Sequence, residues 1–212
     1  EALAASLRNP DDRSRSTIAL GPDSWLATGK TGTGIGFLFP GQGAQQLNMA
    51  GMLAKRFAWA RNLVDQADRM TGELNGMAVS QLMFRNPDQA PGPEERDRWL
   101  TTLSQTENAQ PAICLASLLW FTFFSRLGVR PVAVGGHSLG ELTACFAAGG
   151  LDTATLLEFA AQRGRLMSAP DTADGAMVSL RCGESQATDL IARVDGYLTV
   201  ATANPCNPDV LE

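Results

Sequence analysis

The segment Gly136-His137-Ser138-Leu139-Gly140 contains the pattern glycine-x-serine-x-glycine. In this pattern the serine lies on a sharp turn between a strand and a helix, which exposes its hydroxyl for attack on a carbonyl carbon. The flanking glycines are needed because a side chain there would collide with neighbouring backbone. Free N–H groups at the start of the following helix lie where oxyanion charge develops. Ser138 is therefore the candidate nucleophile, and the competing interpretation is a glycine-rich turn with an inert serine.

The residues around Ser138 predict the strand and helix that such a turn requires. Residues 131–134 form a short apolar run typical of a buried strand, and residues 139–148 have helical spacing. A second apolar run covers residues 35–39 and ends at Pro40-Gly41. Fully apolar strands suit a parallel sheet that is buried on both faces. Further helices are expected over residues 47–69, 94–103, 108–127 and 152–167, the last with Asp152 as its N-cap. This alternation predicts an α/β fold.

The two ends of the chain have different patterns. Residues 1–34 are largely polar and interrupted by proline and glycine, which is typical of an interdomain linker. After Pro170 the pattern predicts a strand over residues 176–181, a helix over 185–194 and a second strand over 197–201. This β-α-β unit begins near residue 174 and is expected to open a smaller subdomain.

Composition excludes several classes of protein. The chain has 212 residues, a net charge of −5 and 44% hydrophobic residues, so it can bury a core and lacks the basic balance of a nucleic-acid-binding protein. The four cysteines are widely spaced and form no C-x-x-C pair, so they predict no metal site. They are instead expected to be reduced core residues of a cytoplasmic protein. The longest apolar run, residues 113–124, is shorter than the roughly 20 residues that a membrane span needs.

Several spaced motifs together resemble one family. They are Phe39-Pro40-Gly41-Gln42-Gly43, Gln110-Pro111-Ala112, Gly136-His137-Ser138-Leu139-Gly140-Glu141 and Gln162-Arg163-Gly164. The chain is similar in these motifs to malonyl-CoA:acyl-carrier-protein transacylases and to the acyltransferase domains of polyketide and polyunsaturated fatty acid synthases. The resemblance implies an α/β-hydrolase-like large subdomain over residues 35–173. It also implies that residues 174–212 begin a small ferredoxin-like subdomain.

The resemblance also implies roles for individual residues. Ser138 would take a malonyl group from the CoA thioester and pass it to the phosphopantetheine thiol of an acyl carrier protein. The backbone N–H groups of Gln42 and Leu139 would form the oxyanion hole, and Arg163 would bind the free carboxylate of the malonyl group. Arg165 is expected to be solvated and Glu141 to be structural. Met167 and Met177 are expected to lie in the core or to line the pocket, with the core favoured. The resemblance implies no bound cofactor. It implies a neighbouring ketosynthase domain.

The match departs from the family pattern at the general base. His137 is the only histidine, and adjacent side chains in a tight turn diverge, so His137 is not expected to reach the Ser138 hydroxyl. In the family the catalytic histidine follows the small subdomain. We therefore expect the 212 residues to be an N-terminal portion of the domain that by itself forms little acyl-serine. Two alternatives stay open: a serine hydrolase or proofreading thioesterase, and a non-catalytic segment of a megasynthase.

Overall fold

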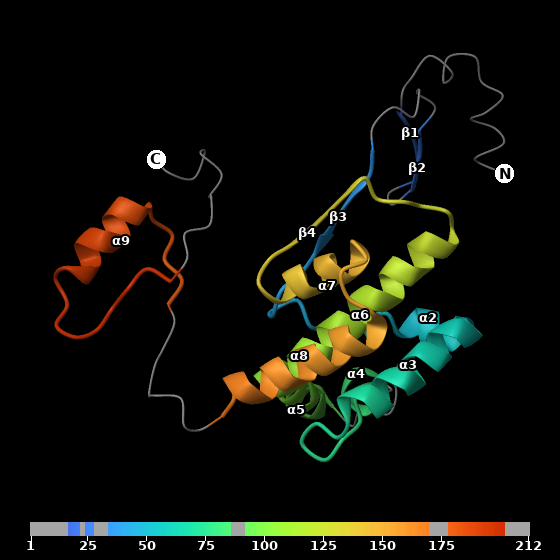
Figure 1. Cartoon of the computed structure of the whole chain (residues 1–212), viewed down its shortest axis with the longest axis horizontal. Helices are drawn as coiled ribbons and strands as arrows, with labels where there is room; N and C mark the ends of the chain where they lie inside the picture. Colours follow the sequence, from blue (N-terminus) through green and yellow to red (C-terminus); the bar gives the residue numbers. More distant parts are fainter. Residues whose placement is uncertain (1–16, 22–23, 28–33, 86–91, 170–177, 202–212) are drawn as a thin grey trace. The chain divides into compact units, whose positions relative to one another are not determined.

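The structure is a computed structural model, and it describes residues 17–21, 24–27, 34–85, 92–169 and 178–201. The chain divides into two compact units, Glu1–Ala169 and Pro170–Glu212. The described elements, labelled in Figure 1, are β1(Thr17–Gly21), β2(Ser24–Ala27), β3(Gly36–Phe39), α2(Gly51–Arg56), α3(Ala58–Thr71), α4(Val79–Met83), α5(Pro93–Ser104), α6(Thr106–Arg126), β4(Ala133–Gly136), α7(Leu139–Ala147), α8(Thr153–Met167) and α9(Glu184–Ile191).

Two strand pairs are present among the described residues. Strands β1 and β2 pair antiparallel, within the stretch that the sequence predicts to be a linker. Strands β3 and β4 pair parallel, with Phe39 opposite Gly136. Parallel strands need a crossover connection, and here the chain between them forms α2 to α6. The predicted α/β architecture with parallel strands is therefore confirmed, and the carboxyl ends of β3 and β4 meet at one edge.

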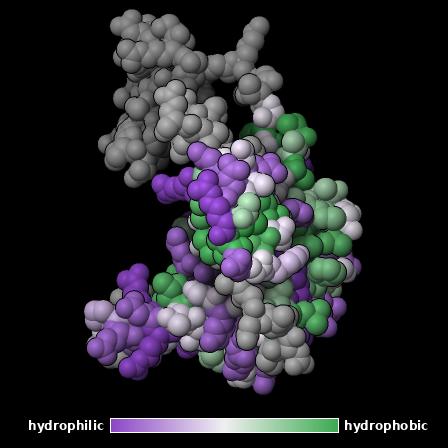
Figure 2. Space-filling model, turned by 90° about the vertical axis from the view of Figure 1, so that its left-hand side faces the viewer, coloured by the Kyte–Doolittle hydropathy of each residue, from purple (hydrophilic) through white to green (hydrophobic). Residues whose placement is uncertain are grey.

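The expectation that this sheet is buried on both faces is wrong for the described residues. Successive side chains of a strand point to opposite faces. Phe39 is buried, and its ring and that of Phe37 pack against Phe121 of α6. Leu38, between them, is 87% exposed. Leu38 is therefore one of several exposed hydrophobic side chains. Figure 2 shows one face of the molecule, on which hydrophobic residues lie at the surface beside hydrophilic ones.

Helix α6 is the central element of the first unit, and Figure 1 shows α7 and α8 beside it. Its residues from Asn108 to Leu119 are all buried, including Pro111 in its second turn. Pro111 is the sixth residue of α6 and lies inside the helix, beyond the first turn, so its missing N–H removes one intrahelical hydrogen bond. No helix among the described residues has the length and hydropathy to cross a membrane.

The helix expected over residues 47–69 is instead two helices, α2 and α3. Phe57 separates them in an extended conformation, with φ −117° and ψ 130°. The extended backbone places the Phe57 ring in contact with Trp59 and with Phe123 of α6. A tertiary contact therefore overrides the helical periodicity at this position.

The second unit contains α9 as its only regular element within residues 178–201. The segments 178–181 and 197–201, which the sequence predicts as parts of strands, are not strands. A strand needs a hydrogen-bonded neighbour, and neither segment is paired with a described residue. Tyr197 is accordingly 93% exposed. The ferredoxin-like subdomain and the boundaries at residues 34 and 173 stay predictions.

Candidate active site

Ser138 lies on the turn between β4 and α7, as the sequence predicts. It is exposed and forms the N-cap of α7, with φ 53° and ψ −109°. A positive φ is costly for a residue with a Cβ and persists only where the surroundings impose it. Here the strand immediately before Ser138 and the helix immediately after it impose the conformation. This strained turn holds the serine at the carboxyl edge of the strand pair.

The two glycines of the motif permit this turn by their lack of side chains. A Cβ added at Gly140 would overlap the carbonyl oxygen of Phe39 and lie 2.8 Å from its carbonyl carbon. A Cβ at Gly136 would overlap the carbonyl group of Gly140 and lie 2.7 Å from the amide nitrogen of Glu141. Both obstacles are backbone atoms, which cannot rotate away. The glycines therefore allow α7 to start against the end of β3.

The turn after β3 lies beside the serine turn, as the register of β3 and β4 requires. A Cβ at Gly41 would lie only 2.7 Å from the carbonyl oxygen of His137. The turn is closed by a hydrogen bond from the Ala44 N–H to the Gly41 oxygen (3.4 Å), and Gly43 has φ 109°. The N–H of Gln42, in this turn, donates to no described residue.

The start of α7 supplies a second free N–H. Leu139 is the first residue of the helix, and its N–H also has no acceptor in the described part of the chain, although its side chain is buried. The next carboxylate, Glu141, accepts the N–H of Ser138 with its Oε1 at 3.2 Å. This contact agrees with the structural role expected for Glu141, because the carboxylate closes a capping box at the start of α7. Two unpaired amides thus flank Ser138.

The His137 imidazole lies beside the turn after β3. Its backbone N–H donates to the oxygen of Phe39 (3.4 Å), and its Nδ1 lies 3.5 Å from the position of a Cβ at Gly41. No hydrogen bond joins His137 to the Ser138 hydroxyl among the described residues. The imidazole therefore packs over the Gly41 turn, consistent with the expected divergence of adjacent side chains.

Arg163 lies on α8 and is held by α6. Its Nη1 donates to Gln110 Oε1 at 2.7 Å, and the completely buried Gln110 in turn donates from Nε2 to Met167 Sδ at 3.4 Å. The described residues contain a single salt bridge, Arg98–Glu95, so no described carboxylate neutralises Arg163. A half-buried guanidinium without an acidic partner retains donors for an anionic ligand.

Three residues of α6 that sequence reasoning left without a role connect these parts. Thr106 accepts a hydrogen bond from Gln42 Nε2 (3.0 Å), Gln110 binds Arg163, and Cys114 Sγ lies 3.7 Å from Thr143 Oγ1 of α7. Burial raises the pKa of Cys114 to about 11, and the nearby hydroxyl of Thr143 offsets part of that effect. Their four-residue spacing places them on one side of the helix. Non-aliphatic residues at this spacing in an otherwise apolar helix are the sequence pattern from which their shared role could have been predicted.

Several neighbouring expectations are corrected. Arg165 is not simply solvated, since its Nη2 donates to the backbone oxygen of Thr71 at 2.6 Å, at the end of α3. Met167 is 53% exposed and contacts Gln110 rather than lying in the core. Cys114 is buried as expected, but Cys145 is exposed. Met177 and Cys206 lie outside the described residues.

The glycine of the Gln162-Arg163-Gly164 motif brings α8 against α6. A Cβ at Gly164 would lie 2.8 Å from Glu107 Cα and 3.0 Å from the oxygen of Thr106. Close approach at Gly164 is what brings the preceding residue, Arg163, within hydrogen-bonding distance of Gln110. The motif thus combines a cation with the small residue that positions it.

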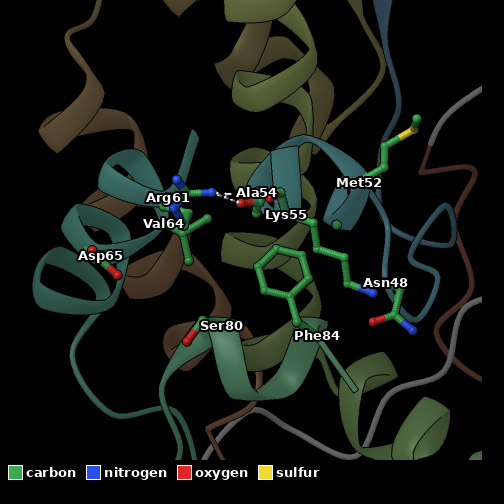
Figure 3. Close-up of a pocket in the computed structure, with 10 residues that line it drawn as sticks. Asn48, Met52, Ala54, Lys55, Arg61, Val64, Asp65, Ser80 and Phe84 are labelled. Carbon is green, nitrogen blue, oxygen red and sulfur yellow. Dashed lines mark hydrogen bonds between the residues drawn. The ribbon is translucent and has the colours of Figure 1, made fainter. Parts of the chain in front are cut away.

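A separate cavity of about 750 Å³ lies among α2, α3 and α4, and Figure 3 shows its lining. The side chains of Phe84 and Lys55 line this cavity. Arg61, which also lines it, donates a hydrogen bond to the backbone oxygen of Ala54 (3.2 Å). None of the four predicted site residues, Ser138, Gln42, Leu139 and Arg163, lines it. The cavity is therefore distinct from the serine turn.

A parallel strand pair whose edge carries a strained serine turn and two unpaired amides defines an α/β fold of the nucleophile-elbow type. A model of the acyl transferase domain family matches residues 36–208, and the chain belongs to this family. It is 33% identical to the polyketide synthase GfsA of Streptomyces halstedii, over 96% of this chain and 2% of that protein. It is also 33% identical to BaeC of Bacillus velezensis, a polyketide biosynthesis malonyl CoA-acyl carrier protein transacylase, over 82% of this chain and 53% of BaeC.

Solved structures agree with this assignment. The acyl-carrier-protein-S-malonyltransferase of Bartonella henselae superposes with a TM-score of 0.53 and 31% identity, covering 65% of this chain and 40% of that one. The acyl transferase domain of ZmaA has a TM-score of 0.62 at 24% identity, covering 80% and 37%, and supports the fold alone. The chain spans about half the length of the transacylase BaeC and a small part of the synthase GfsA.

Proposed function

We propose that this chain carries the acyl-accepting site of an acyltransferase that moves a malonyl-type group from CoA to an acyl carrier protein. In the first step the Ser138 hydroxyl adds to the thioester carbonyl, the C–S bond breaks, and CoA leaves as a thiol. In the second step the phosphopantetheine thiol of the carrier attacks the acyl-serine ester and regenerates the hydroxyl. The family membership and the names of the relatives support this reaction class.

The observation that carries the proposal is the pair of unpaired amides beside Ser138. The N–H groups of Gln42 and Leu139 come from two different turns, yet both lie at the edge where β3 and β4 end. Such donors stabilise the oxyanion of a tetrahedral intermediate, and removal of one typically costs about 10²- to 10³-fold in rate. This pairing supports acyl transfer through Ser138.

Arg163 supports a substrate with a free carboxylate. A guanidinium binds a carboxylate through two parallel hydrogen bonds, and Gln110 holds one of its nitrogens while the other donors remain available. We propose that Arg163 binds the distal carboxylate of the malonyl group and so favours it over acetyl. We also propose an acyl carrier protein as partner and a ketosynthase as neighbouring domain. The names of the relatives, a polyketide synthase and a malonyl CoA-acyl carrier protein transacylase of polyketide biosynthesis, support this proposal.

The test is acylation of the full-length protein with malonyl-CoA, followed by peptide mass spectrometry. Malonyl should be found on Ser138, and Ser138→Ala should abolish it, while Ser125→Ala, on the far part of α6, should not. Addition of a holo-carrier protein should then move the acyl group to its thiol faster than water releases malonate. Absence of acyl-serine would refute the proposal, and preferential release to water would favour a hydrolase.

A further inference from the structure

The turn that carries the Gln42 amide is attached to the junction of α5 and α6 by two glutamine side chains. Gln42 Nε2 donates to Thr106 Oγ1 at 3.0 Å, and Gln45 Nε2 donates to Ser104 Oγ at 3.1 Å. Ser104 is the last residue of α5 and Thr106 the first of α6. Two neighbouring hydroxyls on a helical corner therefore hold both ends of a turn some 60 positions earlier in the chain.

Gln45 also determines which amide of the turn is available. Its Oε1 accepts the N–H of Gly43 at 2.8 Å, while the N–H of Ala44 donates to the oxygen of Gly41. Of the three successive amides from Gln42 to Ala44, the first alone has no described acceptor. The Gln45 carboxamide thus makes two hydrogen bonds: its oxygen accepts from the Gly43 N–H, and its nitrogen donates to Ser104 at the junction of α5 and α6.

We infer that Gln45, with Ser104 and Thr106, positions the oxyanion donor of Gln42. This inference rests on the proposed function, because it assumes that the Gln42 N–H faces the developing oxyanion. Gln45 touches no reacting atom and is a positioning residue. The turn itself contains Gly41 and Gly43, and glycine leaves backbone free to move. A donor on such a flexible turn needs external contacts to stay pre-organised, and displacement of a reacting group by about 1 Å costs on the order of 10²-fold.

The experiment measures single-turnover acylation of Ser138 by malonyl-CoA in the full-length protein over a range of substrate concentrations. Gln45→Met removes both hydrogen bonds at similar size, and the adjacent Gln46→Met is the matched control, because Gln46 is exposed and its side chain bonds to no described residue. A second pair, Thr106→Val and Thr106→Ser, removes or keeps the hydroxyl at the other anchor. Thermal unfolding of each variant is followed in parallel.

We expect Gln45→Met to lower the limiting acylation rate by about 10- to 100-fold with the half-saturating concentration changed less than about twofold. Thr106→Val should lower the rate in the same way, and Thr106→Ser and Gln46→Met should resemble wild type. Equal rates for Gln45→Met and Gln46→Met, or a change confined to half-saturation, overturn the inference. If Gln45→Met does not fold, the Thr106 pair decides. A wild-type protein that forms no acyl-serine refutes the proposed function instead.

Discussion

Substitution of Gly140 by alanine directly probes how the serine turn is held against β3. The added Cβ would overlap the carbonyl oxygen of Phe39 and lie 2.8 Å from its carbonyl carbon and 3.0 Å from the oxygen of Pro40. Three backbone atoms of one strand end therefore resist the methyl group, and none of them can change rotamer. The start of α7, which carries Ser138 as its N-cap, has to move away from β3.

Two opposing free energies set the expected loss of stability. Overpacking by one methyl group typically costs 1–3 kcal/mol, and alanine gains up to about 1 kcal/mol over glycine in a helix. We therefore expect Gly140→Ala to lower the free energy of unfolding by about 1–2 kcal/mol. Ordinary van der Waals contact begins near 3.4 Å, so relief of the overlap with the Phe39 oxygen requires a shift of more than about 1 Å. A shift approaching 1 Å between Ser138 and the Gln42 amide would lower the acylation rate by on the order of 10²-fold.

Urea unfolding and malonyl loading of Ser138 measure the two quantities separately. Gly36→Ala is the matched control, because its Cβ would meet nothing closer than the oxygen of Ala133 at 3.7 Å on the same strand pair. That variant should unfold within about 0.5 kcal/mol of wild type and load at the wild-type rate. A Gly140→Ala protein with unchanged stability and unchanged loading would show that α7 does not depend on close contact with β3, and the geometric argument would fail.

Three further perturbations separate the neighbouring groups. Arg163→Ala should reduce malonyl loading about 10- to 100-fold and acetyl loading much less, because only malonyl offers a carboxylate; equal losses in a paired loading assay would contradict this. Arg165→Ala should leave loading unchanged but lower the free energy of unfolding in urea by about 1 kcal/mol, since it removes the hydrogen bond to the Thr71 oxygen; wild-type stability would contradict it. Because burial raises the Cys114 pKa to about 11, its thiol should resist alkylation at pH 8, where exposed Cys145 reacts; mass spectrometry measures the labelling, and fast labelling of folded Cys114 would refute the burial. The free energy of unfolding in urea should also fall as pH rises from 9 towards 11, because the Cys114 thiol ionises more readily in the unfolded chain.

The parts of the fold that the sequence predicts correctly are governed by local signals. At Gly136 the backbone that excludes a side chain belongs to Gly140 and Glu141, so this requirement of the serine turn acts within five residues. Helix α8 begins after Asp152, as predicted, and the Asp152 Oδ1 accepts the N–H of Thr155 at 2.7 Å. An N-cap is likewise a contact between residues three apart. Such contacts are visible in the order of the residues.

The parts that the sequence does not predict depend on partners far along the chain. Arg165 binds an oxygen 94 positions away, and Gln45 binds a hydroxyl 59 positions away. The helical break at Phe57 likewise follows a ring contact with Phe123. Alternating apolar residues around Tyr197 suit a strand, but a strand exists only by pairing, and no described residue pairs with them. Periodicity records what a segment can form, whereas these contacts decide what it does form.

The buried helix α6 explains how a site assembled from distant segments can be precise. Thr106, Gln110 and Cys114 lie on one side of it, and each contacts a different element: the Gln42 turn, α8 at Arg163 and α7 at Thr143. Gln110 and Cys114 are buried, and buried polar groups are costly unless they are paired, so these two residues restrain the partners that satisfy them. Because a helix is rigid over the two turns from Thr106 to Cys114, the spacing of the Gln42 turn, Arg163 and the serine helix α7 is set by one element. The geometry of the reacting groups therefore depends on residues of α6 that need not touch the substrate themselves.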